Sequence, residues 1–183
     1  DLSGVDLSGV DLSGVDLSGV DLSGVSSGNI VGIPSALPTN WSLINGYLIG
    51  PEADLTDADQ IKLLIDDIVL QYGGVDILIS NAGSAPQVAL LELDEDTLRQ
   101  SFEINFFAHF YLAQEIGRLF VRHRIKGQML FNISKQAINP GRDFGAYGLP
   151  KATLMFLVKQ LALELGKNGV RVNGINADRI RSG

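Results

Sequence analysis

Apolar residues recur with different periods along this chain. Residues 1–25 are five copies of DLSGV, a five-residue period that fits neither the 3.6 residues of a helical turn nor the two of a strand. Residues 26–53 have no clear period and contain several prolines and glycines, which favours loops or short strands. From residue 56 onward, helical spacing alternates with short apolar runs. The chain therefore divides into a repetitive start, an irregular stretch and a part with regular elements.

The regular part predicts alternating helices and strands. Thr56 can cap a first helix that ends near Tyr72. Val75–Ser80 is almost wholly apolar, which is typical of a strand buried on both faces of a parallel sheet. The further elements are expected as a helix over 97–123, a strand over 128–133, a helix over 146–166 and a strand over 170–175. This order predicts βαβ units and an α/β fold with a doubly wound parallel sheet.

The repeat allows two interpretations. Units centred on a leucine that follows an aspartate resemble those of pentapeptide-repeat proteins, whose chains wind into a four-sided β-helix. Five units would complete little more than one coil, and a solenoid needs stacked neighbours to bury its core. The shortness of the array favours the alternative, a low-complexity extension. We expect this extension over 1–25 and a single domain over 26–183.

Composition narrows the possible functions. At 183 residues, 45% of them hydrophobic, the chain is long enough for one domain with a substantial core. Without cysteine and with two histidines, it offers no disulfide framework or thiolate metal site, and we expect no metal. Five of the 21 acidic residues lie in the repeat, which leaves 16 acids against 14 bases elsewhere, so nothing indicates nucleic acid or anionic membrane as a partner. We find no membrane span or signal peptide and expect a cytoplasmic protein.

The segment FNISKQAINPGRDFGAYGLPK, residues 131–151, combines three side chains suited to proton transfer. Tyr147 and Lys151 are four residues apart, so a helix places them on one face. An ammonium group about 4 Å from a phenol lowers the free energy of its ionised form, which makes the phenol a usable proton donor and acceptor. Ser134, at the end of a predicted strand, can hydrogen-bond the same substrate oxygen.

Further polar residues stand where strands meet helices. Asn81, Ala82 and Gly83 directly follow a predicted strand, at the carboxyl edge where open α/β sheets bind ligands. Gly83 would let the backbone approach a cofactor closely. Asp54 lies at the preceding corner, in the segment ADLT, and Asn105 lies inside the long predicted helix.

Together, these residues make the chain from about Ala53 onward resemble the short-chain dehydrogenase/reductase family. The resemblance implies a Rossmann-like fold, NAD or NADP as cofactor, and hydride transfer to or from a carbonyl or secondary alcohol. It implies four catalytic residues. Asn105 would belong to a proton relay, and Ser134 would align the substrate. Tyr147 would be the general acid/base, with Lys151 as its partner. The resemblance also implies a cofactor-binding set of Asp54, Asn81, Ala82, Gly83, Tyr147 and Lys151.

A narrower resemblance concerns the substrate. NPGRDFGAYGLPKA and VRVNGINADRIRSG are similar to the dehydrogenase half of bifunctional aldolase/short-chain dehydrogenase proteins, which act on small hydroxy-aldehydes in deoxysugar breakdown. This resemblance implies a small hydroxy-aldehyde or sugar derivative. The choice between NAD and NADP stays open, because it depends on a strand end that the pattern does not locate.

The fold is expected to be incomplete at both ends. The segment SGVSSGNI, residues 23–30, imitates a glycine-rich phosphate loop, but Ile30 replaces its last glycine. Only 30 positions separate Gly24 from Asp54, where a βαβ unit and a further strand need about 50. The sequence stops at Gly183, before the family's final strand. The alternative to an enzyme is therefore a non-catalytic fragment that lacks a competent cofactor site.

Two departures touch the predicted active site. Lys135 stands where related motifs often carry the catalytic serine, so it competes with Ser134 for that position. Ala177 and Asp178 replace a Pro-Gly turn that the resemblance leads us to expect after the last strand. The loop on the nicotinamide side should therefore differ from that of the family.

Two of the predicted helices carry more apolar side chains than one core can cover. These residues are Phe102, Phe106, Phe107, Phe110 and Tyr111 in the first helix, and Leu149, Leu154, Met155, Phe156, Leu157, Val158, Leu161 and Leu163 in the second. A helix that is apolar nearly all round is covered on more than one side. We therefore expect a homodimer or homotetramer formed through this pair of helices.

Overall fold

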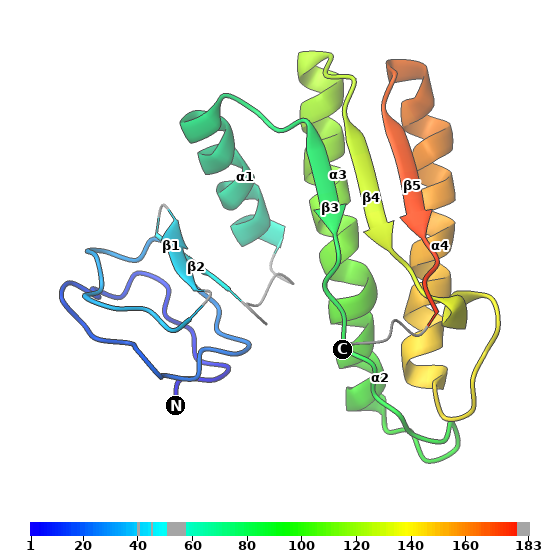
Figure 1. Cartoon of the computed structure of the whole chain (residues 1–183), viewed down its shortest axis with the longest axis horizontal. Coiled ribbons are helices and arrows are strands. Elements are labelled where there is room, and N and C mark those ends of the chain that lie inside the picture. The colour runs from blue at the N-terminus through cyan, green and yellow to red at the C-terminus, as the bar shows by residue number, and fades with distance from the viewer. Residues whose placement is uncertain (40, 45, 51–57, 179–183) are drawn as a thin grey trace. The chain divides into compact units, whose positions relative to one another are not determined.

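The computed structural model describes residues 1–39, 41–44, 46–50 and 58–178. The chain divides into two compact units, Asp1–Asp67 and Ile68–Gly183. Figure 1 shows the elements of both units in chain order. The units have different architectures, and each is described separately below.

The DLSGV repeats wind into a coil with 20 residues per turn. In each unit, the aspartate Oδ1 accepts a hydrogen bond from the backbone N–H of the serine two residues later, at 2.8–2.9 Å. The next residue, glycine, has a φ between +64° and +74°, which glycine adopts readily because it has no Cβ. Parallel bridges join Asp6 to Ser26, Asp11 to Val31 and Asp16 to Ala36. Residues up to Ala36 therefore supply the second turn on which the first one stacks.

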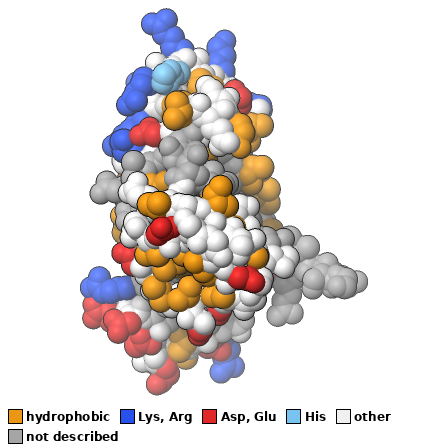
Figure 2. Space-filling view, turned by 90° about the vertical axis from the view of Figure 1, so that its left-hand side faces the viewer, with side chains coloured by type: hydrophobic (Ala, Val, Ile, Leu, Met, Phe, Trp, Pro, Cys, Tyr) orange, Lys and Arg blue, Asp and Glu red, His pale blue; other side chains and the backbone are white. Residues whose placement is uncertain are grey.

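The core of this N-terminal unit is a ladder of leucines. Its buried apolar residues are Leu7, Leu12, Leu17, Leu22, Val25, Ile30 and Leu48. The repeat aspartates are exposed, and Figure 2 shows acidic side chains on one face of the molecule. The five-residue period thus places one leucine of each unit inside and one carboxylate outside.

A short hairpin completes the unit. It consists of β1 (Ser42–Ile44) and β2 (Tyr47–Ile49), which pair antiparallel. Backbone hydrogen bonding ties it to the coil, because the Ile30 N–H donates to the Gly46 carbonyl at 3.0 Å. The described part of the irregular stretch therefore forms coil and hairpin, and neither shares a sheet with the strands of the C-terminal unit.

The C-terminal part alternates helices and strands. Its elements are α1 (Ala58–Tyr72), β3 (Ile77–Ser80), α2 (Glu95–Phe102), the π-helical turn η1 (Glu103–Phe107), α3 (Ala108–His123), β4 (Gln128–Asn132), the 3₁₀ turn η2 (Lys135–Ala137), α4 (Gly145–Leu165), the 3₁₀ turn η3 (Gly166–Asn168) and β5 (Arg171–Ile175). The strands form a parallel sheet in the order β3-β4-β5. The predicted α/β fold with its parallel sheet is confirmed.

Helices α3 and α4 lie on the same face of this sheet (Figure 1). Met129, Phe131 and Val172 point toward that layer and are buried. On the other face, Ile77 and Ile79 are 57% and 69% exposed. The prediction that the first of these strands is buried on both faces is therefore wrong, because both long helices of the unit pack on one side.

Candidate active site

The carboxyl ends of β3 and β4 are joined through two asparagines. Asn81 follows β3, Asn132 ends β4, and the Asn132 Nδ2 group donates to Asn81 Oδ1 at 2.8 Å. Parallel pairing brings both strand ends to one edge of the sheet. The loop of Asn81, Ala82 and Gly83 therefore starts at a fixed point on the edge where the sequence predicts a ligand.

Asn105 fixes the continuation of this loop. Its fully buried side chain donates from Nδ2 to the Ser84 carbonyl at 2.8 Å, and its Oδ1 accepts from the Ser84 N–H at 3.3 Å. It sits in the π-helical turn η1, a widened turn that occurs frequently at functional sites. Both ends of the amide are therefore engaged with the chain.

The same asparagine is connected to α4. Nδ2 of Asn105 also donates to Ser101 Oγ at 3.1 Å, and the Ser101 hydroxyl donates to the Ala146 carbonyl at 2.8 Å. That carbonyl lacks its ordinary helical donor, because the residue four positions on is Pro150, which has no N–H. Because of the proline, the Ala146 carbonyl can accept from Ser101. This hydrogen bond connects the helix that carries Tyr147 to Asn105 through Ser101.

Tyr147 and Lys151 lie together on α4. The Lys151 Nζ atom is 5.7 Å from the centre of the Tyr147 ring, and it donates to the Asn132 carbonyl at 3.1 Å. Lys151 is only 2% exposed, and burial lowers the pKa of its ammonium group to about 8. The predicted placement of these two side chains on one helix face is confirmed.

Gly83 brings the loop against this lysine. A Cβ at this position would lie 3.0 Å from Asn105 Oδ1 and 3.4 Å from Lys151 Nζ. Only a residue without a side chain lets the backbone come this close. The structure therefore brings Asn81, Gly83, Asn105 and Lys151 into one contiguous cluster beside Tyr147.

His109 belongs to this cluster, although the sequence analysis did not assign it. Its ring is fully buried, with Nε2 2.9 Å from the Ala82 carbonyl and Nδ1 2.6 Å from Ser80 Oγ. Since a carbonyl only accepts, Nε2 carries the proton and the Ser80 hydroxyl donates to Nδ1. Burial lowers the pKa of His109 to about 4, and the nearby Lys151 cation adds to the effect. A neutral histidine thus holds the loop at Ala82, while Asn105 holds it at Ser84.

A sequence signal for His109 did exist. It lies four residues after Asn105, so the two share a helix face, and a hydroxyl residue, Ser80, immediately precedes the Asn-Ala-Gly loop. What the sequence does not show is that this strand and helix are in contact.

The two candidates for the substrate-aligning position differ in their contacts. Ser134 caps η2, and its Oγ accepts from the Gln136 N–H at 3.2 Å. Lys135 instead forms an ion pair with Asp178 at 2.8 Å. Gly148 allows the close approach of η2 to α4, because a Cβ there would lie 3.3 Å from the Gln136 carbonyl. Ser134 is thus held near the start of α4, while the Lys135 ammonium is engaged at the end of β5.

The structure does not place the remaining predicted cofactor contacts in this cluster. Asp54 lies outside the described residues. Gly24 and Gly28, in the segment that imitates a phosphate loop, are parts of the N-terminal coil.

Within the described ranges, we find no group of three metal-ligating side chains and no helix long and apolar enough to cross a membrane.

Comparison with known proteins gives two family matches. A sequence model of short chain dehydrogenases matches residues 26–182, and one of pentapeptide repeats matches residues 1–26. The first match begins inside the coil, because residues 26–36 form its second turn. The match to the dehydrogenase model therefore begins within residues that fold as part of the repeat coil.

Individual relatives are dehydrogenases. The chain is 33% identical over 132 residues to (+)-borneol dehydrogenase 1 of Salvia officinalis, covering 71% of this chain and 50% of that protein. It is 33% identical over 120 residues to L-2,3-butanediol dehydrogenase of Corynebacterium glutamicum, covering 66% and 46%. Among solved structures, 4-hydroxyisoleucine dehydrogenase complexed with NADH and succinate matches with a TM-score of 0.64 at 30% identity, covering 69% of this chain and 59% of that one. The chain thus spans about half the length of these curated relatives.

Proposed function

Because the chain belongs to the short-chain dehydrogenase family, we propose that its C-terminal unit is an oxidoreductase site. The reaction is reversible hydride transfer between a nicotinamide cofactor and a carbonyl or secondary alcohol. The observation that carries this proposal is the buried Lys151 cation, fixed by the Asn132 carbonyl and 5.7 Å from the Tyr147 ring. Burial destabilises the cation of a lysine that has only a structural role. Beside a phenol that transfers protons, the same cation stabilises the ionised form of the phenol.

We propose that Tyr147 is the general acid/base. Its side chain is half-buried, so its hydroxyl can reach both substrate and solvent. Lys151 stabilises negative charge on that hydroxyl, and Ser134 hydrogen-bonds the substrate oxygen. Asn105 supports the proton relay by fixing the loop, since both ends of its amide are engaged by neighbouring groups.

NAD or NADP is the proposed cofactor, which when bound supplies or accepts the hydride. The residues at the sheet edge fit its nicotinamide end. An ammonium group has three protons, and the Asn132 carbonyl is the one acceptor for Lys151 within the described residues, so further donors are available for ribose hydroxyls. Asn81, Ala82 and Gly83 would flank this end of the cofactor, and Asp54 remains the predicted adenine contact.

The proposed substrate is a small hydroxy-aldehyde or sugar derivative. Support comes from the resemblance of residues 139–152 and 170–183 to aldolase/dehydrogenase fusions, and from a relative that acts on 2,3-butanediol. A cytoplasmic location likewise stays a prediction from the composition.

Oxidation of NADH and NADPH, followed at 340 nm with a panel of small hydroxy-aldehydes and ketones, tests the proposal. We expect turnover with at least one of the two cofactors. The rate of turnover should be higher with hydroxylated substrates than with plain ketones. Absence of turnover across the panel, in either direction, would contradict it.

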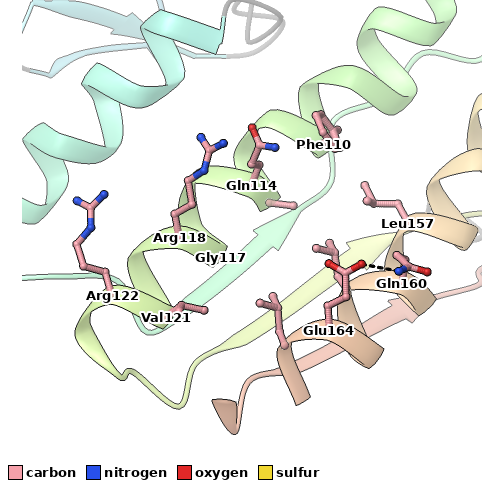
Figure 3. A pocket seen from close by; sticks show the side chains of 12 residues that line it. Phe110, Gln114, Gly117, Arg118, Val121, Arg122, Leu157, Gln160 and Glu164 are labelled. Atoms are coloured by element: carbon pink, nitrogen blue, oxygen red, sulfur yellow. Dashed lines mark hydrogen bonds between the residues drawn. The ribbon is translucent and has the colours of Figure 1, made fainter. Parts of the chain in front are cut away.

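We further propose a homodimer or homotetramer through α3 and α4. A groove of about 590 Å³ lies between these helices (Figure 3). Its lining is largely apolar and includes Phe110, Val121, Leu157 and Leu161. Such an exposed apolar groove is typical of an association surface.

Light scattering tests this assembly. We expect the wild type to be at least dimeric and Leu161→Arg, in the groove, to be monomeric. Lys159→Glu is the control, because Lys159 is exposed on the same helix and does not line the groove. A monomeric wild type would overturn the proposal.

A further inference from the structure

We propose that residues 23–30 of this chain provide no cradle for the pyrophosphate of the cofactor, so that the nicotinamide mononucleotide end carries most of the binding. The inference rests on the proposed function, because it concerns the same site. It predicts that reduced nicotinamide mononucleotide binds nearly as tightly as NADH.

At least four of the eight backbone N–H groups of this segment are already in use, including that of Ser23, which donates to Asp21 Oδ1 at 2.9 Å. A phosphate loop binds its anion through several free backbone N–H groups that point at one spot. Here the Val25 N–H donates to the Leu22 carbonyl at 3.1 Å, the Ser26 N–H to the Val5 carbonyl at 3.2 Å, and the Ile30 N–H to the Gly46 carbonyl at 3.0 Å. These donors close the turns of the coil and hold the hairpin, so they are not available to a ligand.

The glycines of the segment serve the coil as well. Gly24 has a φ of +64°, and the corresponding glycine of each preceding repeat has a similar value. Gly28 faces the Tyr47 ring, since a Cβ there would lie 3.2 Å from it. Gly24 is therefore accounted for by its turn and Gly28 by its contact with Tyr47, so neither requires a pyrophosphate to explain it.

Side-chain burial and the following elements agree with this conclusion. Val25 is 1% exposed and Ile30 is 8% exposed, and both belong to the leucine core. No described residue up to 50 is helical, so no helix N-terminus follows the segment to stabilise an anion. The nicotinamide end differs, because there a buried cation and a close backbone approach converge at one sheet edge.

Calorimetric titration of the full chain with NADH and with reduced nicotinamide mononucleotide tests the proposal without any turnover. We expect NADH to bind at most about tenfold more tightly, since the pyrophosphate has no cradle and the predicted Asp54 contact to adenine adds only about 1 kcal/mol. NADH binding more than about thirtyfold tighter would overturn the inference and leave the proposed function standing. Failure of both ligands to bind would overturn both.

A charge variant sharpens the test. Asn29 is exposed, is the next-to-last residue of the segment and has a φ of +52°, which aspartate also tolerates. We expect Asn29→Asp to change the dissociation constant of NADH by less than about twofold, like the control Asn168→Asp at another exposed position. A weakening above about fivefold for Asn29→Asp alone would show that phosphate lies there, and would overturn the inference.

Discussion

The two units of this chain bury different kinds of groups. In the N-terminal coil, one leucine per repeat fills the core, while the repeat aspartates remain exposed. In the C-terminal unit, Lys151, His109 and Asn105 are buried together with two serines. Each of these polar groups has a hydrogen-bond partner, as burial requires. The comparison shows that the buried lysine and the buried histidine of the described residues both lie beside the Asn-Ala-Gly loop.

Buried side chains stabilise the first unit, whereas under the proposed function those of the second unit serve the reaction. The coil gains its stability from apolar burial and from backbone bonds between its turns. The sheet edge keeps a cation and a neutral histidine away from water at a cost in stability, which under the proposed function serves the reaction. Substitutions in the first unit should therefore affect its folding, and substitutions at the sheet edge should affect reactivity or the pH dependence of stability.

Removing the buried cation should have the largest effect. We expect Lys151→Met to lower turnover by a factor of about 10²–10³, because the Tyr147 hydroxyl loses the charge that stabilises it. The free energy of unfolding should stay the same or rise, since a buried charge disappears. Lys159→Met, an exposed position on the same helix, is the control. Turnover within threefold of the wild type would contradict the assignment.

Truncating the leucine ladder should come next. Leu12→Ala should destabilise the N-terminal unit by about 2–5 kcal/mol, because it leaves a cavity in a small core. Trp41, the single tryptophan, packs against this core and reports its urea unfolding by fluorescence. Val10→Ala, at a position 37% exposed, should cost far less. Equal losses in the two variants would remove the distinction between inside and outside positions.

The buried histidine should produce a pH dependence in the second unit. The folded chain binds the His109 proton only near its pKa of about 4, whereas the unfolded chain binds it near 6.5. The unfolded state therefore holds more protons between these values, and the free energy of unfolding falls by up to about 3 kcal/mol as the pH drops from 6.5 to 4.

Denaturation followed by circular dichroism at pH 7 and 4.5 measures this loss. His109→Gln, whose amide can bond both Ser80 and the Ala82 carbonyl, should reduce the difference between the two pH values. The exposed His123→Gln should leave it unchanged. The prediction is wrong when both variants retain the full pH dependence.

The smallest expected effect concerns the loop glycine. Gly83→Ala should lower turnover about tenfold, because the added Cβ, 3.0 Å from Asn105 Oδ1, moves the loop by a few tenths of an ångström. Gly166→Ala, where nothing lies within 4 Å of the added atom, serves as control. Unchanged turnover in Gly83→Ala would show that the loop position is not critical.

The sequence predicts the second unit far better than the first. Strands and helices from Ile77 onward appear within a few residues of their predicted bounds, because their hydrophobic periods are local. The helix pair Tyr147 and Lys151 follows from the same local geometry. Residues 26–36 could not be assigned from the sequence, because Ser26, Val31 and Ala36 pair with residues 20 positions earlier and the stretch no longer carries the DLSGV repeat. Contacts such as His109 with Ser80 depend on packing between elements and have no local pattern.

A single-turnover experiment tests the central claim most directly. NADH oxidation by a small hydroxy-aldehyde is followed at 340 nm in the wild type, in Tyr147→Phe and in Tyr72→Phe, whose tyrosine is 70% exposed. We predict that Tyr147→Phe slows hydride transfer at least about 100-fold, since it lacks only the proton-transferring hydroxyl, while Tyr72→Phe matches the wild type. Hydride transfer in Tyr147→Phe within threefold of the wild-type rate would contradict the account.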